Sequence, residues 1–323
     1  MFHYYNIGLQ RFKTSDIKNF TSDFGLRFRR LINRPFRAVL NIATPGKIIV
    51  ESYPKLKKGE AYIFAATHSF VDEITSLLSV IDRSVYTLMG STNQLECNPK
   101  IYANWLNGLV YVDRHSEKSR KESMPKMERV LASGSSVLIF PEGGWNNTEN
   151  LLVLKLFPGV YNLANKTGKK VVPIRCFREH GKKNIYVKAL EPIDLAAYEK
   201  EEAMTFLRDQ LATLVYEAIE QHATPICRDE LPTNARELFM KERKDEYLKT
   251  KWTRDVWDEE ITVYRDKNHP LPPEVHAAYD AVNVNHYNVH LIAPVWAERD
   301  DDIRHDFIRY MKENWNKKDD QSK

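Results

Sequence analysis

The sequence contains little cysteine. Cys97, Cys176 and Cys227 lie far apart in a chain of 323 residues, and none belongs to a C-x-x-C pair. Small disulfide scaffolds and structural zinc modules both depend on several cysteines at short spacings. The cysteine content therefore argues against both classes and is typical of a protein kept in a reducing cytosol.

Long apolar runs are also missing. No stretch approaches the 18 apolar residues that predict a transmembrane helix, and the start MFHYYNIGLQ lacks the basic-then-apolar pattern of a signal peptide. We therefore expect no membrane span. Hydrophobic residues still make up 42% of the chain and aromatic residues 11%, which predicts a sizeable core and excludes general disorder.

The net charge is only +4, but it is unevenly distributed. Residues 1–48 carry a net charge of +7, so the remainder carries −3. Basic residues in this segment are Arg11, Lys13, Lys18, Arg27, Arg29, Arg30, Arg34, Arg37 and Lys47, against the acids Asp16 and Asp23. A basic end of this kind indicates an anionic partner, such as a membrane surface, a nucleic acid or an acidic protein.

The middle of the chain alternates short apolar stretches with helical patterns. Strands are predicted at residues 61–67, 85–89, 109–112, 136–140, 171–176 and 185–190, which are rich in β-branched and aromatic residues. Helices are predicted after His68, at 123–133 with Pro125 in the first turn, at 158–167 before Gly168, and at 195–221. This alternation predicts an α/β fold, a mostly parallel sheet flanked by helices with active residues at strand ends.

Residues 16–33 form a pattern of their own. Ile17, Phe20, Phe24, Phe28 and Leu31 recur at spacings of three and four, with arginines mainly off that stripe. The pattern predicts a basic amphipathic helix, which either packs on its own domain or docks on anionic lipid, and both can hold. The resulting domain prediction is a basic segment at 1–48, an α/β domain at 49–224 and a polar, mainly helical extension at 225–323.

Two weaker patterns, a histidine pair and the basic N-terminal segment, do not by themselves indicate a function. His286 and His290 are spaced four residues apart, but NVNHYNVHLIAPV alternates like a strand and no acid completes a metal site, so we predict no metal. Nucleic-acid binding rests on the basic N-terminal segment alone, and no known nucleic-acid-binding motif accompanies it, so we predict no nucleic-acid partner.

Four blocks follow or occupy predicted strands, in the order ATHSFVDE, GLVYVDR, FPEGGWN and VVPI. Their order and residues resemble the glycerolipid acyltransferase family, whose best-known members are 1-acylglycerol-3-phosphate acyltransferases. That family has His with Asp five residues on, then G-x-[IV]-x-[VI]-[DE]-R, F-P-E-G-T-R and V-P-[VI]. The resemblance covers about residues 60–220 and implies an acyltransferase fold and activity.

Acyl transfer to a hydroxyl needs a base, and a neutral imidazole is the usual one near pH 7. His68 is the candidate, with a carboxylate one helical turn away to fix its tautomer. Strict family spacing favours Glu73 as that carboxylate, whereas a one-residue deletion in the loop would make it Asp72. Alone, the H-x-x-x-D-E pattern is more typical of a solvated helix start. Backbone N–H groups at a helix start could bind the developing oxyanion.

The resemblance also implies residues that bind the acceptor. Arg114 matches the arginine of the second block, and Glu142 and Gly143 match the third. Where the family has Thr-Arg, this chain has Gly144 and Trp145, so the acceptor phosphate loses an arginine fork. Lys155 is a nearby cation that could replace the charge, and Trp145 could stack on a ring or line an acyl channel.

The resemblance implies an acyltransferase that takes an acyl group from acyl-CoA or acyl-ACP, by direct attack and without a cofactor. The predicted acceptor is a lysophospholipid or a glycerol-phosphate-type molecule. The predicted location is cytoplasmic, peripheral on the inner face of a membrane, with an acyl carrier protein as a further partner. The alternatives are a non-catalytic lipid-binding or scaffold protein on the same fold, and a hydrolase in which His68 activates water.

Overall fold

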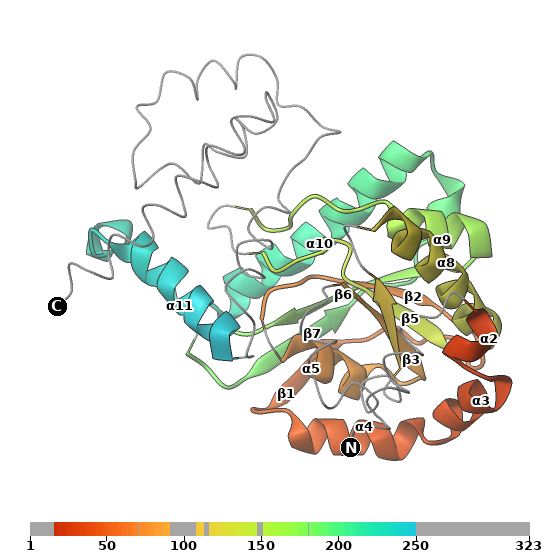
Figure 1. Cartoon of the computed structure of the whole chain (residues 1–323). Coiled ribbons are helices and arrows are strands. Elements are labelled where there is room, and N and C mark those ends of the chain that lie inside the picture. The colour runs from red at the N-terminus through yellow and green to blue at the C-terminus, as the bar shows by residue number, and fades with distance from the viewer. Residues whose placement is uncertain are drawn as a thin grey trace. The chain divides into compact units, whose positions relative to one another are not determined.

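The computed structural model describes residues 16–70, 72–90, 108–112, 116–146, 151–179 and 181–249 (Figure 1). The chain divides into two compact units. The first, Met1–Glu230 with Lys249–Lys251, contains the sheet, and helix α11 (Ala235–Lys249) begins in the second, Leu231–Leu248 with Trp252–Lys323.

A seven-stranded sheet organises the first unit. Its strands, within the described residues, lie in the order β1-β7-β6-β2-β5-β3-β4. β6 and β7 pair antiparallel, and each other neighbouring pair of this sheet is parallel, which confirms the mostly parallel sheet. The strands are β1 (Ile48–Ser52), β2 (Ile63–Ala66), β3 (Val85–Gly90), β4 (Leu109–Val112), β5 (Ser136–Ile139), β6 (Val171–Phe177) and β7 (Ile185–Ala189).

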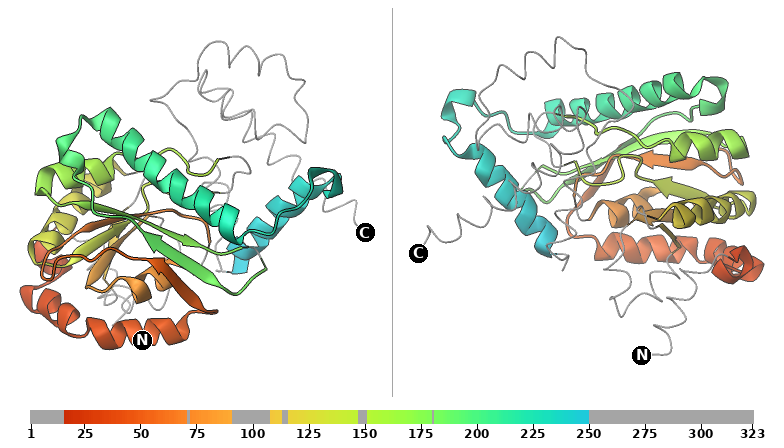
Figure 2. Two further views of the ribbon diagram at one scale, coloured as in Figure 1. Left: turned by 180° about the vertical axis from the view of Figure 1, so that it is seen from behind. Right: turned by 45° about the horizontal axis from the view of Figure 1, so that its top comes forward.

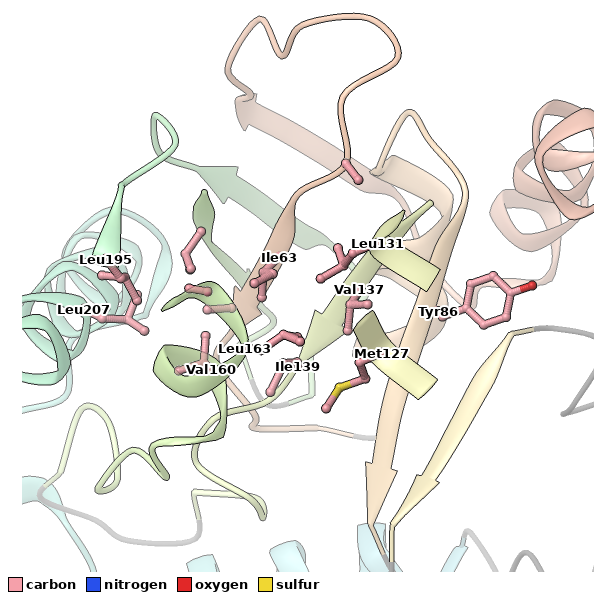
Figure 3. Close-up of a cluster of buried hydrophobic side chains, with 14 of the residues drawn as sticks. Ile63, Tyr86, Met127, Leu131, Val137, Ile139, Val160, Leu163, Leu195 and Leu207 are labelled. Carbon is pink, nitrogen blue, oxygen red and sulfur yellow. The ribbon is translucent and has the colours of Figure 1, made fainter. Parts of the chain in front are cut away.

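Helices cover both faces of this sheet. Side chains alternate along β2, so Ile63 and Ala65 enter one core cluster while Phe64 and Ala66 enter the other. The first cluster packs under α8 (Glu117–Ala132), α9 (Gly159–Thr167) and α10 (Lys200–His222), as Figure 3 shows. The second packs under α5 (Glu73–Val80), and α4 (Asn33–Ala43) packs on α5. The right-hand view of Figure 2 shows the sheet between α10 and α4.

Six strands and most of the helices lie where the sequence predicts them. β1 was not predicted, because its sequence IIVES is short and ends in polar residues. Such a sequence is possible here because β1 is an edge strand of the sheet, paired with β7. Helix α9 ends at Gly168, whose φ of 61° is left-handed, as predicted. Helix α10 begins at Lys200 and not at 195, because Leu195–Ala197 is a separate 3-10 turn capped by Asp194.

The predicted start of α8 was wrong. The helix begins at Glu117, eight residues before Pro125, so that this proline lies inside it and not in its first turn. The hydroxyl of Ser116 accepts a hydrogen bond from Ser119 N at 3.2 Å and caps the helix. A Lys121–Glu117 ion pair supports the charged first turns, which carry no apolar stripe from which to predict them.

The single helix predicted over residues 16–33 was also wrong. The chain forms α2 (Ile17–Phe20) and α3 (Asp23–Leu31), and α4 follows directly. The helix restarts because the hydroxyl of Ser22 accepts from Gly25 N at 3.1 Å and caps α3. The predicted stripe does not face one way, since Phe20 is buried and Phe24 is 76% exposed.

These N-terminal helices are held to the domain by arginines. Arg29 is buried, its guanidinium lies 4.0 Å from the ring centroid of Phe36, and burial lowers its pKa to about 10. Arg37 donates to the carbonyls of Ser79 and Val80 at 3.0 and 2.9 Å. These carbonyls belong to the last turn of α5, so α4 satisfies the end of the helix that begins with Glu73.

Among the described helices, none is both long enough and apolar enough to cross a membrane. The tail histidines His286 and His290 lie outside the described residues.

Candidate active site

His68 lies two residues beyond the carboxyl end of β2. β2 lies between β6 and β5, and β5 leads directly into the block that begins at Phe140. Because parallel strands end at the same edge of a sheet, the first and third sequence blocks lie side by side there.

Glu73 contacts the imidazole. Its Oε1 lies in hydrogen-bonding contact with Nδ1 of His68, and its Oε2 accepts from Ser69 N at 2.8 Å and Phe70 N at 3.4 Å. Glu73 is fully buried and is the first residue of α5, where the helix dipole stabilises a negative charge. A carboxylate at Nδ1 selects the tautomer with its proton there and leaves Nε2 with a lone pair.

Asp72 points to a different partner. Its Oδ2 accepts a hydrogen bond from Nη1 of Arg178 at 3.0 Å, and the Arg178 guanidinium lies 4.5 Å from the ring centroid of Phe70. Arg178 directly follows β6, the neighbour of β2 in the sheet. Of the two acids left open by the sequence, Glu73 therefore contacts His68, while Asp72 ties the loop to the end of β6.

Aromatic rings surround the imidazole. The centroid of the Phe140 ring lies 4.4 Å from that of His68, and Trp145 meets His68 edge-on at 6.1 Å. Trp145 is only 4% exposed and His68 is intermediate in exposure. The residue that replaces the family's third-block arginine is therefore packed beside the candidate base.

The peptide groups of His68 are held by the third block. His68 N donates to Oε1 of Glu142 at 2.9 Å, and His68 O accepts from Asn146 N at 2.7 Å. The second oxygen of Glu142 accepts from Leu154 N at 2.8 Å. The carboxyl of Glu142 is buried, and burial raises its pKa to about 8.

Three main-chain N–H groups just before α5 already have acceptors. His68 N donates to Glu142, and Ser69 N and Phe70 N donate to Glu73. These three donors orient the carboxyls around the base, so the prediction of an oxyanion site rests on N–H groups further into the helix.

The remaining predicted site residues lie in different settings. Gly143 has a φ of 72°, and a Cβ there would lie 2.6 Å from the Phe157 ring, so this position requires glycine. Gly144 is buried and Lys155 is intermediate in exposure. Arg114 lies outside the described residues.

Sequence reasoning missed two neighbours of His68, Phe140 and Asn146, and also Arg178, the partner of Asp72. The first two stood within the quoted block FPEGGWN, but nothing in the letters says that Asn146 N reaches His68 O. Arg178 follows VVPIRCF, and only the pairing of β6 with β2 brings it to Asp72. Among the described residues, no three metal-ligating side chains gather.

A family model described as Acyltransferase matches residues 47–177. The match runs from the start of β1 to the end of β6 and includes His68, Glu73 and Glu142. Residues 47–177 are therefore similar to the acyltransferase family.

Two curated proteins are similar to part of this chain. The 1-acyl-sn-glycerol-3-phosphate acyltransferase of Haemophilus influenzae is 26% identical over 106 residues, 30% of this chain and 43% of that protein. The enzyme of the same name from Borreliella burgdorferi is 29% identical over 120 residues, 32% of this chain and 46% of that protein. The matched part thus spans less than half the length of each relative.

A solved structure is also similar to this chain. It is the 1-acyl-sn-glycerophosphate (LPA) acyltransferase PlsC from Thermotoga maritima, with 19% identity and a TM-score of 0.45. The alignment covers 69% of this chain and 90% of that chain.

Proposed function

We propose that the protein transfers an acyl group from a thioester, acyl-CoA or acyl-ACP, to a hydroxyl of a lysophospholipid or glycerol-phosphate-type acceptor. The observation that carries the proposal is the contact of His68 Nδ1 with the buried carboxylate of Glu73, at the carboxyl end of β2. The names of the two curated relatives support the same reaction class.

The chemistry follows from that contact. With its proton on Nδ1, His68 offers Nε2 as a base to the acceptor hydroxyl, whose oxygen attacks the thioester carbonyl. Glu73 stabilises the imidazolium that forms. Collapse of the tetrahedral intermediate breaks the C–S bond, and the imidazolium returns its proton to the leaving thiolate. The products are the acyl ester and a free thiol, with no acyl-enzyme.

The acceptor's head group is the open part of this proposal. Trp145 stands where the family has an arginine, and it is buried against His68. Its packing favours an apolar or ring contact near the base over a phosphate fork. Arg114 and Lys155 remain the proposed cations for an acceptor phosphate. The main chain of Glu142, Gly143 and Gly144 is proposed to line the same site.

Thiol release tests the proposed reaction. The purified chain is given acyl-CoAs and acyl-ACPs of several lengths with a panel of lyso-lipids and glycerol phosphate, beside His68→Ala as a matched control. We expect thiol release that needs an acceptor and is lost in His68→Ala. Release without an acceptor would indicate a hydrolase, and no release from any pair would favour the non-catalytic lipid-binding alternative.

We also propose that α3 and α4 dock the protein peripherally on a membrane, on its inner, cytoplasmic face. The helices expose Phe24, Phe28, Leu31, Val39 and Ile42, which are 76%, 48%, 79%, 62% and 84% exposed. Arg27, Arg30 and Arg34 are exposed on the same two helices. Exposed apolar side chains among arginines suit the boundary between anionic headgroups and acyl chains.

Vesicle sedimentation tests this docking surface. The double variant Phe24→Glu/Leu31→Glu is expected to bind phosphatidylglycerol-containing vesicles about tenfold or more weakly, because it loses apolar burial and gains repulsion. Tyr216→Glu/Ile226→Glu changes the charge equally at exposed positions elsewhere and should bind like the unmodified chain. Equal binding of the unmodified chain to phosphatidylcholine and phosphatidylglycerol vesicles would contradict electrostatic docking.

A further inference from the structure

The main chain of His68 is hydrogen-bonded on both sides to another segment. Its N–H donates to Oε1 of Glu142, and its C=O accepts from Asn146 N at 2.7 Å. Both polar atoms of one residue's main chain are thus bonded to a single turn, residues 140–146, that follows the neighbouring strand β5. The position of the imidazole therefore depends on that turn as well as on β2.

Glu142 itself is a bridge between two loops. Oε1 accepts from His68 N at 2.9 Å, and Oε2 accepts from Leu154 N at 2.8 Å. Its side chain is 1% exposed, so both oxygens face protein and neither faces an incoming molecule. An acceptor-binding carboxyl would need an oxygen directed at the substrate, and this geometry offers none.

The bridge also explains why a buried carboxyl is tolerated. An acid removed from water costs free energy unless its oxygens receive hydrogen bonds, and here each oxygen receives one from a main-chain N–H. A glutamine of the same shape offers one acceptor oxygen and one NH₂ group. That NH₂ group would face an N–H donor, so one of the two loops would lose its bond.

We propose that Glu142 is a positioning residue, which fixes the His68 main chain against the segment at Leu154 and so sets the imidazole in place beside Glu73. The consequence for catalysis rests on the proposed function, whereas the bridge itself does not. The Glu142 side chain then acts on the chemical step through His68, and its carboxyl does not bind the acceptor.

Steady-state kinetics separate positioning from acceptor binding. Glu142→Gln is expected to lower kcat about 10- to 100-fold, because small displacements of a catalytic group are costly. The KM for the acceptor should change less than about threefold, since no substrate contact is removed. Glu217→Gln removes a carboxylate paired with Lys188 far along the chain and serves as the matched control. A raised acceptor KM with kcat unchanged would overturn the proposal.

Amide hydrogen exchange tests the bridge without any activity. In the unmodified chain, the N–H groups of His68 and Leu154 should exchange at least about 100-fold more slowly than in an unstructured peptide. In Glu142→Gln at least one of the two should exchange faster, while Val137 in β5 stays protected. Fast exchange of both groups in the unmodified chain would overturn the proposal, even if the variant failed to fold.

The two measurements also separate this proposal from the proposed function. If the unmodified chain transfers no acyl group but Glu142→Gln frees the His68 amide, the proposed function fails and the bridge stands. If acyl transfer is normal, and Glu142→Gln changes neither the exchange rates of the two amides nor kcat, the bridge fails and the proposed function stands.

Discussion

Replacing Glu73 with glutamine is expected to lower kcat for acyl transfer about ten-thousandfold, the scale seen when the acid of a histidine pair is neutralised. The buried carboxylate contacts Nδ1 of His68 and accepts from Ser69 N and Phe70 N. An amide in its place can present NH₂ to Nδ1, which favours the wrong tautomer, and it cannot stabilise the imidazolium. Thiol release at saturating substrate measures the effect.

Asp72→Asn is the matched control for that experiment. It neutralises the neighbouring acid, which pairs with Arg178 at 3.0 Å in a partly exposed ion pair. Such pairs contribute little, so kcat should fall less than about fivefold. The opposite ranking, with Asp72→Asn the more damaging change, would mean that Asp72 holds the histidine in the working protein.

The sequence predicted which residues belong to the candidate site better than it predicted the contacts among them. The order of the blocks singled out His68, Glu73 and Glu142, and the parallel arrangement implied that they share one edge of the sheet. What each side chain does there depends on contacts between distant segments. Glu142 reaches His68 across 74 residues, and Arg178 reaches Asp72 across 106. No local pattern encodes such pairings, so the sequence could not show that the Glu142 side chain reaches the main chain of His68.

The fold shows the same division between local and distant causes. Strands buried on both faces, such as β2, are continuous apolar runs, which are easily predicted from the sequence. The prediction of one helix at 16–33 was wrong because α2 ends at Phe20 and Ser22 then caps the start of a new helix, α3, despite the continuous apolar period. The buried residues of α3 are Leu26 and Arg29. The burial of Arg29 could not be expected from the apolar pattern, because arginine is charged.

A second buried arginine carries a larger structural consequence. Arg175 on β6 is fully buried, and its guanidinium donates to Leu214 O at 3.0 Å and Tyr186 O at 3.1 Å. A third nitrogen pairs with Glu51 on β1. The group therefore joins α10, β7 and β1, and the low exposure of Arg175 makes each bond hard for water to replace.

Arg175→Met is expected to lower the free energy of unfolding by about 3–5 kcal/mol, the cost of breaking a buried ion pair from one side. Methionine fills similar space, so the loss comes from groups that lose their partner: the carbonyls of Leu214 and Tyr186, and Glu51, which keeps its contact with His222. The midpoint of urea denaturation, followed by circular dichroism, measures the change. Arg208→Met removes an exposed arginine paired with Asp209 and should shift stability by less than about 0.5 kcal/mol.

A double variant identifies the source of that cost. If the stranded carboxylate dominates, Glu51→Leu added to Arg175→Met should restore part of the lost stability, since an apolar pair in place of a buried ion pair is often neutral. If the carbonyls dominate, the second change adds its own loss. A stability loss under about 1 kcal/mol in Arg175→Met alone would contradict the assignment, because a buried guanidinium with these partners cannot be removed so cheaply.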